Sequence, residues 1–447
     1  MRWLDSLFTT DALRRVFADR GRLQGMLYFE AALARALARA GVIPGAAAAR
    51  IEACCRAEMF DADELARDTA LAGNTAIPMV NALTALVARA DGDAARWVHF
   101  GATSQDAMDT GLVLQLRDAL ALIDADLARI GEALERLARA HARTLQAGRT
   151  WLVHAQPTTF GRKVAGWLDA VDRDRARLAE WRARGLAAQL GGAVGTLAAF
   201  GDAGPAVAAA LAEELKLVCP ALPWHAHRDR VAEAATTLGL LVGTLGKIAR
   251  DVALMTQTEV GEAFEPAEAG RGGSSSMPHK RNPIGCATVL AAATRVPALV
   301  SVMLAAMVQE HERGLGGWQA EWETLPEICA LAGGAAAHMG HVLAGLRVDV
   351  DRMRRNVDAT RGQIFAGAAA VALAPHVGAA AALGLVEAAA RRADADGAHL
   401  RDVLAADAEV RAHLGDADLA AAFDAEAAVG PAAAEVDRAL AARGGHT

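Results

Sequence analysis

The sequence predicts an all-α fold built around a central bundle of long helices, and three observations predict it. Hydrophobic residues make up 53% of the 447 residues, yet the aromatic share is only 4% and alanine supplies much of the apolar content. Alanine is the strongest helix former, whereas strands favour β-branched and aromatic residues. Two long segments place apolar residues at helical spacing, and no segment alternates apolar and polar residues for long enough to predict a strand.

Two long helices are predicted by seams of apolar residues that step by three and four positions. The first seam is Leu120, Ile123, Leu127, Ile130, Leu134 and Leu137, and the second is Leu238, Leu241, Leu245, Ile248, Val252 and Met255. Such seams allow two helices to lie against one another. A third long helix is predicted from Pro283 to about Gln309, with Asn282 as its N-cap.

Shifts in composition divide the chain into three predicted parts. These are an N-terminal helical domain over residues 1–105, a long-helix bundle over 106–350 and a C-terminal helical domain over 351–447. The stretch from Gly362 to Val386 has no charged residue, but it is rich in alanine and glycine and contains Pro375. We therefore expect two helices that meet at this proline, and no membrane span.

Charge and cysteine content narrow the class of protein. The chain has 46 Lys and Arg against 53 Asp and Glu, a net charge of −7, so it offers no basic surface for nucleic acid. The five cysteines form no spaced pattern, which favours a reducing cytosol over a disulfide scaffold. Charged residues interrupt the first residues of the chain where an export signal needs an apolar stretch. We expect a cytoplasmic protein.

Three polar segments are candidates for function. Residues 269–283 read AGRGGSSSMPHKRNP, a loop that places Lys280 just before a predicted helix N-terminus, where free N–H groups attract anions. A plain polar connector explains that composition equally well. Residues 99–111 read HFGATSQDAMDTG and residues 148–163 read GRTWLVHAQPTTFGRK. On composition alone, helix capping explains the first and a turn with half-buried packing explains the second.

Metal and nucleotide motifs are missing from the sequence. His225 and His227 form the only close histidine pair, and no nearby cysteine or Glu-x-x-His partner completes a zinc pattern. Gly239, Gly243 and Gly246 lie within the second seam and do not have phosphate-binding spacing, so they favour close helix packing. We expect neither a metal nor a cofactor.

The segment GSSSMPHKRNP, residues 273–283, resembles the signature loop of the fumarase/aspartase superfamily, Gly-Ser-Ser-x-Met-Pro-x-Lys-x-Asn. HFGATSQDAMDT and RTWLVHAQPTTFG resemble the other two active-site segments of that superfamily, in the same chain order. The phrases DRGRLQGMLYFEAALARA, HAHRDRVAE, HERGLGGWQAEW and MRRNVDATRG resemble its cycloisomerase branch. The resemblance covers the chain to about residue 400.

The resemblance implies a three-part helical subunit that assembles into a homotetramer whose active sites draw segments from three subunits. It implies that one carboxylate of 3-carboxymuconate adds across a conjugated double bond to give 4-carboxymuconolactone in the breakdown of aromatic acids. The expected partner is a small polycarboxylate substrate, without nucleic acid, membrane, metal or cofactor.

The resemblance also implies roles for individual residues. Ser274 resembles the proton-transfer serine, Lys280 a cation that faces the developing aci-carboxylate, and Asn282 a hydrogen-bonding support. Because the substrate carries three carboxylates, further anion-binding groups are expected, although a surface salt bridge is an equal alternative for Arg313. The predicted catalytic residues are Ser274, Lys280, Trp151 and His154, and the predicted substrate-binding residues are Thr103, Ser104, Thr150, Arg228, Asn282, Arg313 and His99.

Trp151 is a departure from the hydratases and lyases of the superfamily, which carry a histidine after the threonine. Hydroxide and amine leaving groups need acid assistance, whereas a carboxylate with a pKa of about 4 needs little. A tryptophan here therefore suits a cycloisomerase. The alternatives are an adenylosuccinate-lyase-like C–N lyase, which shares the serine loop, and a non-catalytic helical scaffold.

Overall fold

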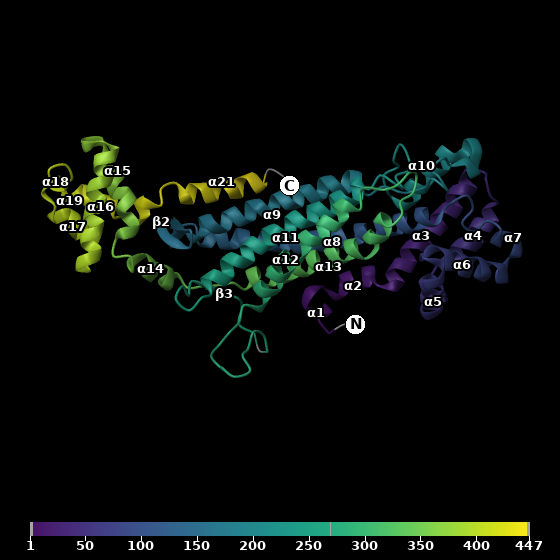
Figure 1. Cartoon of the computed structure of the whole chain (residues 1–447), viewed down its shortest axis with the longest axis horizontal. Coiled ribbons are helices and arrows are strands. Elements are labelled where there is room, and N and C mark those ends of the chain that lie inside the picture. Colours follow the sequence, from purple (N-terminus) through teal and green to yellow (C-terminus); the bar gives the residue numbers. More distant parts are fainter. Residues whose placement is uncertain (1–2, 269, 445–447) are drawn as a thin grey trace. The chain divides into compact units, whose positions relative to one another are not determined.

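The computed structural model describes residues 3–268 and 270–444, and it confirms the all-α fold. Cα packing divides the chain into two units. Unit 1 takes Met1–Leu127, Asp174–Gly246 and Thr288–His338, and unit 2 takes Ala128–Arg173, Lys247–Ala287 and Met339–Thr447. Five long helices contribute residues to both units: α8 (Ser104–Ala140), α9 (Phe160–Gly185), α11 (Asp229–Met255), α12 (Ile284–Ala305) and α13 (Gly317–Ala344) (Figure 1). The three-part division at residues 105 and 350 stays a prediction.

Unit 1 also contains shorter elements, among them α3 (Asp19–Arg39), which is buried on most of its faces. Phe29, Leu33 and Leu37 of α3 are at most 1% exposed. These elements are α1 (Asp5–Phe8), α2 (Asp11–Phe17), α3 (Asp19–Arg39), α4 (Gly45–Cys54), η1 (Ala57–Met59), α5 (Ala62–Ala72), α6 (Ala76–Ala90), α7 (Gly92–Ala95), η2 (Ala198–Ala203) and α10 (Gly204–Leu215).

The long helices follow the two predicted seams. All six residues of the second seam are buried, and so are those of the first seam from Leu120 to Leu134. Two of the glycines that interrupt the second seam lie where α12 approaches closely. A Cβ on Gly246 would lie 2.7 Å from the Ala293 side chain, and one on Gly239 would lie 3.1 Å from that of Val300. Both glycines therefore permit close packing, as the sequence predicts.

Unit 2 holds the described strands and the C-terminal helices. Its elements are β1 (Leu145–Thr150), β2 (Val153–Thr159), β3 (Ala263–Phe264), β4 (Arg347–Val348), α14 (Val350–Asp358), η3 (Gln363–Phe365), α15 (Ala366–Val377), α16 (Ala379–Asp396), α17 (Leu400–Ala406), α18 (Ala408–Arg411), α19 (Asp416–Ala422), α20 (Ala425–Ala428) and α21 (Ala432–Gly444). α15 to α19 gather around a shared core that includes Leu373, Val386 and Leu404 (Figure 1).

A β-hairpin forms where the sequence predicts only a turn, so that prediction is wrong. β1 and β2 pair antiparallel, with an irregularity at Gly148 between Ala147 and Arg149. A Cβ at Gly148 would meet the carbonyl oxygen of Gln156 at 2.7 Å, so the close approach requires glycine. Thr159 is the one buried residue of β2, and a strand without a buried face shows no alternation of apolar and polar residues.

The helices near Pro375 also differ from the prediction. α15 continues through Pro375 to Val377, and the break follows at Gly378, whose φ of +86° favours glycine. α12 is the one described helix long and apolar enough to cross a bilayer, judged by length and composition alone. Only 22% of its most apolar window is buried within the chain, which leaves an apolar helix face exposed.

Candidate active site

In unit 1, the Arg313 guanidinium joins two of the predicted substrate-binding residues. Nη1 donates to Thr103 Oγ1 at 2.7 Å, Nη2 to Ser104 Oγ at 3.3 Å, and Nε to Gln105 Oε1 at 3.2 Å. The Arg313 guanidinium also lies 5.9 Å from the centroid of the Trp318 ring. It has no carboxylate partner within the described parts of the chain, so it does not form the salt bridge considered above. A guanidinium beside two hydroxyl groups is a set of donors suited to a carboxylate.

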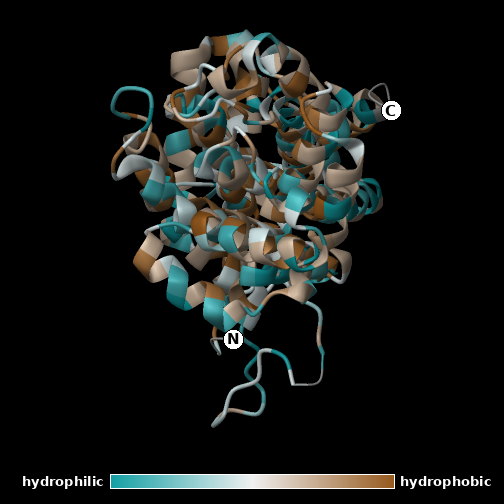
Figure 2. Ribbon diagram, turned by 90° about the vertical axis from the view of Figure 1, so that its right-hand side faces the viewer, coloured by the Kyte–Doolittle hydropathy of each residue, from teal (hydrophilic) through white to brown (hydrophobic). Residues whose placement is uncertain are grey.

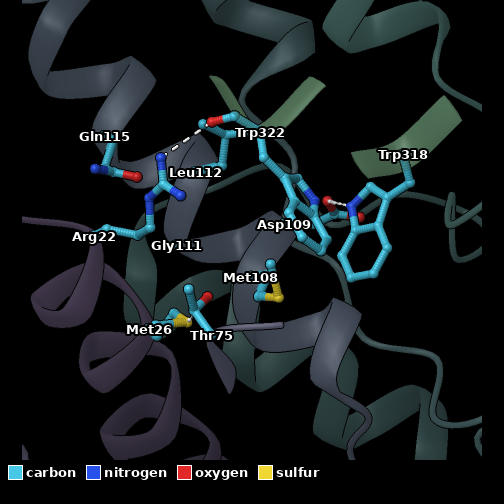
Figure 3. Close-up of a pocket in the computed structure, with 10 residues that line it drawn as sticks. All are labelled: Arg22, Met26, Thr75, Met108, Asp109, Gly111, Leu112, Gln115, Trp318 and Trp322. Carbon is cyan, nitrogen blue, oxygen red and sulfur yellow. Dashed lines mark hydrogen bonds between the residues drawn. The ribbon is translucent and has the colours of Figure 1, made fainter. Parts of the chain in front are cut away.

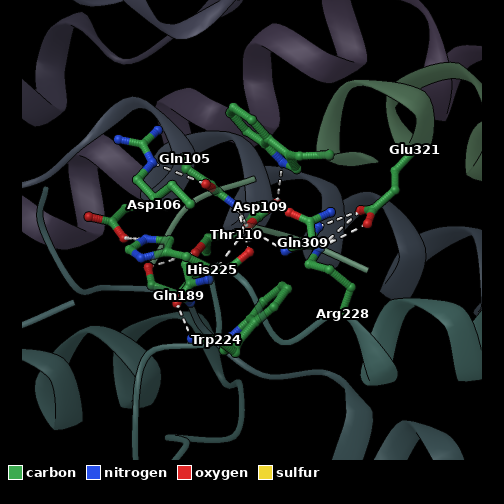
Figure 4. Close-up of polar contacts among 12 residues, drawn as sticks. Gln105, Asp106, Asp109, Thr110, Gln189, Trp224, His225, Arg228, Gln309 and Glu321 are labelled. Atoms are coloured by element: carbon green, nitrogen blue, oxygen red, sulfur yellow. Dashed lines mark hydrogen bonds and ion pairs between the residues drawn. The ribbon is translucent and has the colours of Figure 1, made fainter. Parts of the chain in front are cut away.

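Asp106 holds this corner of unit 1 in place. Its fully buried carboxylate accepts hydrogen bonds from the backbone N–H of Thr103, at 2.9 Å, and from the N–H groups of Gly191 and Gly192. His225 Nε2 lies 2.7 Å from Asp106 Oδ1. One carboxylate therefore fixes three segments around the start of α8, and Figure 4 shows its contact with His225. The bond to Thr103 confirms that helix capping accounts for part of the polar segment 99–111.

Arg228, predicted to bind substrate, lies buried among other charges. It is 1% exposed, and its guanidinium donates to both oxygens of Asp109 at 2.8 and 3.0 Å. Its Nε lies 3.0 Å from Glu321, and its centre lies 4.9 Å from the Trp224 ring centroid. Burial disfavours the cation, but the two carboxylates outweigh burial and raise the pKa of Arg228. Because its N–H groups are engaged, Arg228 is suited to position α8 rather than to contact a substrate (Figure 4).

His99 pairs with a buried carboxylate. Its Nδ1 lies 2.6 Å from Glu30 Oε1 on α3, and Glu30 is 1% exposed. Burial opposes the imidazolium, but the charge of Glu30 and the hydrogen bond to it raise the pKa of His99. His99 therefore shares unit 1 with Thr103, Ser104 and Arg313 but has its own partner.

A small cavity opens beside these residues in unit 1. Met26, Thr75, Met108, Trp318 and Trp322 contribute to its walls (Figure 3). Its volume of about 30 Å³ has room for a water molecule, far less than the several hundred Å³ of a typical ligand site. We therefore assign it no substrate.

In unit 2, Glu262 anchors the hairpin that carries Trp151 and His154. Its carboxylate is fully buried and accepts from Arg149 at 2.6 and 3.0 Å, from Gln146 at 2.7 Å and from Asn356 at 2.7 Å. Burial raises the pKa of a carboxyl group, yet these hydrogen bonds and the charge of Arg149 outweigh burial and lower the pKa of Glu262. The base of the hairpin is therefore tied to α14 by one buried anion.

The tip of the hairpin is exposed and strained. Trp151 is 97% exposed, Leu152 is 77% exposed, and both have positive φ, +53° and +69°. Positive φ is rare for large side chains and is usually met by Asn-Gly in a two-residue turn. Thr150 and His154 flank the tip and are also exposed. Partial burial, together with the charge of Arg149, lowers the pKa of His154, so its imidazole is the more readily neutral.

Ser274 lies in a loop that extends away from the packed helices. Figure 2 shows this loop, which connects β3 to α12, extending away from the helical body. Within it, Ser274 Oγ accepts from the backbone N–H groups of Met277 at 3.1 Å and Ser276 at 3.4 Å. Two amide dipoles aimed at one hydroxyl oxygen stabilise negative charge there. The loop therefore provides the amide support that an ionised serine requires.

The two ends of the serine loop are held together. Gly273 and Arg281 form a β-bridge, and Asn282 donates its backbone N–H to Gly272 O at 2.8 Å. A Cβ at Gly272 would lie 2.5 Å from Asn282 O, so this contact requires glycine. The N–H groups of Gly285 and Cys286 in the first turn of α12 donate to the side chain of Glu265, whereas Asn282 accepts from the N–H of Ile284 through its backbone carbonyl. The capping prediction is wrong because the acceptor comes from 20 residues earlier in the chain.

Beneath the loop, unit 2 contains a cavity of about 800 Å³. Lys280 and Asn282 line it, and Ser274 does not. Lys280 is exposed and makes no ion pair with a carboxylate of residues 3–268 or 270–444. The ammonium is thus available to an anion from outside the chain.

The predicted site residues therefore fall into two groups, one in each unit. Unit 1 brings Thr103, Ser104 and Arg313 into contact, and it also contains His99 and Arg228, which pair with Glu30 and with Asp109 and Glu321. Unit 2 carries Thr150, Trp151 and His154 on the hairpin, and Ser274, Lys280 and Asn282 on the loop.

Sequence reasoning missed Glu262, Glu265 and Glu321 and treated Asp106 and Asp109 as caps only. A signal existed for Asp109, because it lies beyond the first turn of α8, where a cap no longer acts. No signal marked Glu262 or Glu265, whose partners are distant in the sequence.

Comparison with known proteins shows which family the chain resembles. Residues 7–298 match the model of the lyase family, and residues 362–439 match that of the adenylosuccinate lyase C-terminus. The chain is 57% identical to a 3-carboxy-cis,cis-muconate cycloisomerase of Pseudomonas aeruginosa, over 98% of this chain and 95% of that protein. It is 45% identical to a nitrosuccinate lyase of Streptomyces davaonensis, over 95% of this chain and 91% of that protein.

A solved structure is similar along nearly the whole chain. The 3-carboxy-cis,cis-muconate lactonizing enzyme from Pseudomonas putida superimposes with a TM-score of 0.93 at 52% identity, covering 99% of this chain and 98% of that one. Both the sequence signature and the helical fold are thus those of one family of enzymes. The chain belongs to the lyase family of the fumarase/aspartase superfamily.

Proposed function

We propose that the protein is a cycloisomerase that converts 3-carboxy-cis,cis-muconate to 4-carboxymuconolactone in the degradation of protocatechuate and related aromatic acids. The observation that carries the proposal is the serine loop, where two amides face Ser274 Oγ and Lys280 has no carboxylate partner among the residues that the structure describes. The relatives described above support the choice of substrate.

The reaction forms one C–O bond and one C–H bond within a single molecule. A carboxylate of the substrate attacks the conjugated double bond, and charge gathers on the neighbouring carboxylate as an aci-dianion. In this proposal, Lys280 stabilises that charge and Asn282 donates a hydrogen bond to it. Ser274 then delivers the proton to carbon, and its alkoxide is held by the amides of Ser276 and Met277. A proton from solvent restores the serine.

The hairpin supports this chemistry in a different way. In the reverse direction the leaving group is a carboxylate, which departs without a general acid. Trp151 cannot act as a general acid. In this proposal it instead forms an apolar wall over the substrate. His154 is the titratable side chain next to this wall. Thr103, Ser104, Thr150 and Arg313 are proposed to bind substrate carboxylates, with Arg228 and His99 in supporting positions.

We further propose that the active enzyme is a homotetramer whose subunits share active sites. We also propose that it is a cytoplasmic protein. A monomer would leave Trp151 and Leu152 in water together with most of the apolar α12. Exposed apolar patches of this kind mark protein interfaces. The cysteines are free thiols, and four of them are buried, which supports a reducing compartment.

The decisive experiment is an ultraviolet assay with purified protein and 3-carboxymuconate, in buffer with and without a chelator. Lactonisation interrupts the conjugated diene, so absorbance falls, and we expect the same rate in both buffers. No loss of absorbance, or a rate that collapses with the chelator, contradicts the proposal.

A C–N lyase is the second candidate, because of the nitrosuccinate lyase relative and the match to an adenylosuccinate lyase C-terminus. The same preparation is therefore offered nitrosuccinate and adenylosuccinate. Nitrite release from nitrosuccinate at a higher kcat/KM than lactonisation would favour this second function.

A further inference from the structure

The cavity beneath the serine loop carries more positive charge than the proposed mechanism uses. Besides Lys280, its walls include the cations Arg271, Arg281 and Arg347, and its acidic residues are Glu265 and Glu268. Lys280 alone is assigned to the reacting end of the substrate. The other three cations face the same space without an assigned partner.

The acids of the cavity do not neutralise these cations. Glu265 accepts from the N–H groups of Gly285 and Cys286 at the start of α12, at 3.1 and 2.7 Å. Glu268 pairs with His341 at 3.3 Å. None of Arg271, Arg281 and Arg347 forms an ion pair with a carboxylate in the described parts of the chain. The two carboxylates therefore offset only part of the charge of the four cations that line the cavity, and the positive charge that remains favours an anion with more than one carboxylate.

Arg271 is the cation of this cavity with buried hydrogen-bond donors that lack an acceptor among the residues described. Its Nε and Nη2 are buried, and neither donates a hydrogen bond within the described structure. These two nitrogens lie on the same edge of the guanidinium and form the fork that binds a carboxylate through two parallel hydrogen bonds. Buried donors without acceptors are costly, in contrast to Arg228, whose N–H groups are satisfied.

A glycine in α12 makes room for this guanidinium. A Cβ built on Gly285 would lie 3.2 Å from Arg271 Nη2 and 2.7 Å from Val342 Cγ2. The side chain thus lies between the loop and the start of α12, at the wall of the cavity.

We propose that this cavity is a carboxylate subsite and that Arg271 binds a substrate carboxylate that takes no part in bond making. The inference rests on the proposed function, because it takes the cavity that Lys280 lines as the site of that reaction. Arg271 then fixes the orientation of the polycarboxylate, while Lys280 acts on the reacting end. Arg271 therefore makes the enzyme specific for substrates that carry a third carboxylate.

The test compares Arg271→Gln with Arg271→Lys and with Arg354→Gln as a control. Arg354 belongs to the same unit and forms an exposed ion pair with Asp358 at 3.0 Å, outside the cavity. We expect Arg271→Gln to raise KM for 3-carboxymuconate by at least about 30-fold while kcat changes by less than about 3-fold. The KM of Arg271→Lys should lie between those of the parent protein and Arg271→Gln. The KM of the control Arg354→Gln should equal that of the parent protein.

A binding experiment separates this inference from the function itself. Calorimetry with propane-1,2,3-tricarboxylate and with glutarate, which lacks the central carboxyl group, needs no turnover. We expect the parent protein to prefer the tricarboxylate and Arg271→Gln to lose that preference. An unchanged preference and an unchanged KM in Arg271→Gln would overturn the inference. If the parent protein fails to lactonise 3-carboxymuconate but shows an Arg271-dependent preference, the proposed function fails and the subsite stands.

Discussion

At Ser274, the difficulty is that an aliphatic hydroxyl is a weak acid and a weak base. The amides of Ser276 and Met277 point at its oxygen from within the same turn. Hydrogen bonds to a charged group contribute about 1.5–3 kcal/mol each, so two of them stabilise the alkoxide substantially over the hydroxyl. The proximity of the donors in sequence makes this support independent of the rest of the fold.

Ser274→Ala should therefore lower kcat/KM for lactonisation by about 10²–10⁴-fold, the range that a proton-transfer group contributes. The matched control is Ser275→Ala, because Ser275 is an exposed neighbour that makes no side-chain hydrogen bond within the described residues. Both variants should keep the thermal transition and assembly state of the parent protein. A Ser274→Ala protein with full turnover would remove this residue from the mechanism.

His99 makes the stability of the protein depend on pH. Its pKa is raised in the folded state by Glu30, despite burial. A raised histidine pKa adds stability that is complete below the unfolded value of about 6.5 and disappears as pH rises through the folded value. Glu30→Gln keeps a hydrogen-bond acceptor but removes the charge. We expect it to lower the free energy of unfolding more at about pH 5.5 than at about pH 9, measured by urea titration.

The same loss at both pH values would show that His99 is not protonated in the pair. Glu52→Gln serves as the control, because Glu52 forms a half-exposed ion pair with Arg35 in the same unit. Such pairs contribute little, and this one involves no histidine.

At the scale of elements, the β1–β2 hairpin combines a rigid base with a strained tip. Glu262 holds the base through three side chains, whereas Trp151 and Leu152 adopt positive φ and expose large apolar surfaces. Backbone strain of this kind costs about 1–3 kcal/mol per residue and persists where function requires it. We therefore propose that the tip is the part of the hairpin under functional constraint.

Replacing the tip with Asn-Gly, as Trp151→Asn with Leu152→Gly, should separate folding from function. Asn and Gly suit a type I′ turn, so the folded chain should be as stable as the parent protein or more stable in thermal unfolding. Lactonisation should fall by at least about 10-fold, because the apolar wall over the substrate is lost. Retention of full activity would mean that the tip does not reach a substrate.

At the scale of the whole molecule, the candidate residues are distributed over two units. The exposed apolar surfaces support the proposal that other copies of the chain cover them. Ser274 does not line a described cavity, whereas Arg313, Thr103 and Ser104 form a ready set of donors in unit 1. A tetramer that shares its sites supplies each group from a different chain.

Two inactive variants should therefore restore activity when they are mixed. Ser274→Ala and Arg313→Gln are unfolded together in equal amounts and refolded. If the serine and the arginine of a site come from different chains, random assembly gives about one quarter of the sites both groups intact. We expect that fraction of parent activity, with light scattering to confirm a tetramer. A refolded mixture as inactive as either variant alone would place both residues on one chain.

Much of this fold was predictable from local patterns. The two seams identify α8 and α11 because a helix buries every third or fourth residue, and this spacing is visible in the sequence. The serine loop was recognisable from its glycines, serines and lysine. The β-hairpin was not, because its strands are held by Glu262 and by each other, with no buried face to impose alternation.

The sequence by itself determined the helical bundle, the lyase signature and the candidate residues, because these depend on neighbours within a few positions along the chain. Only the tertiary structure decided that Glu265 caps α12, that Arg228 is enclosed by Asp109 and Glu321, and that Arg313 meets Thr103. Those outcomes depend on contacts between residues 20 to 210 positions apart. Burial and charge pairing over such separations are set by packing, and no local pattern records them.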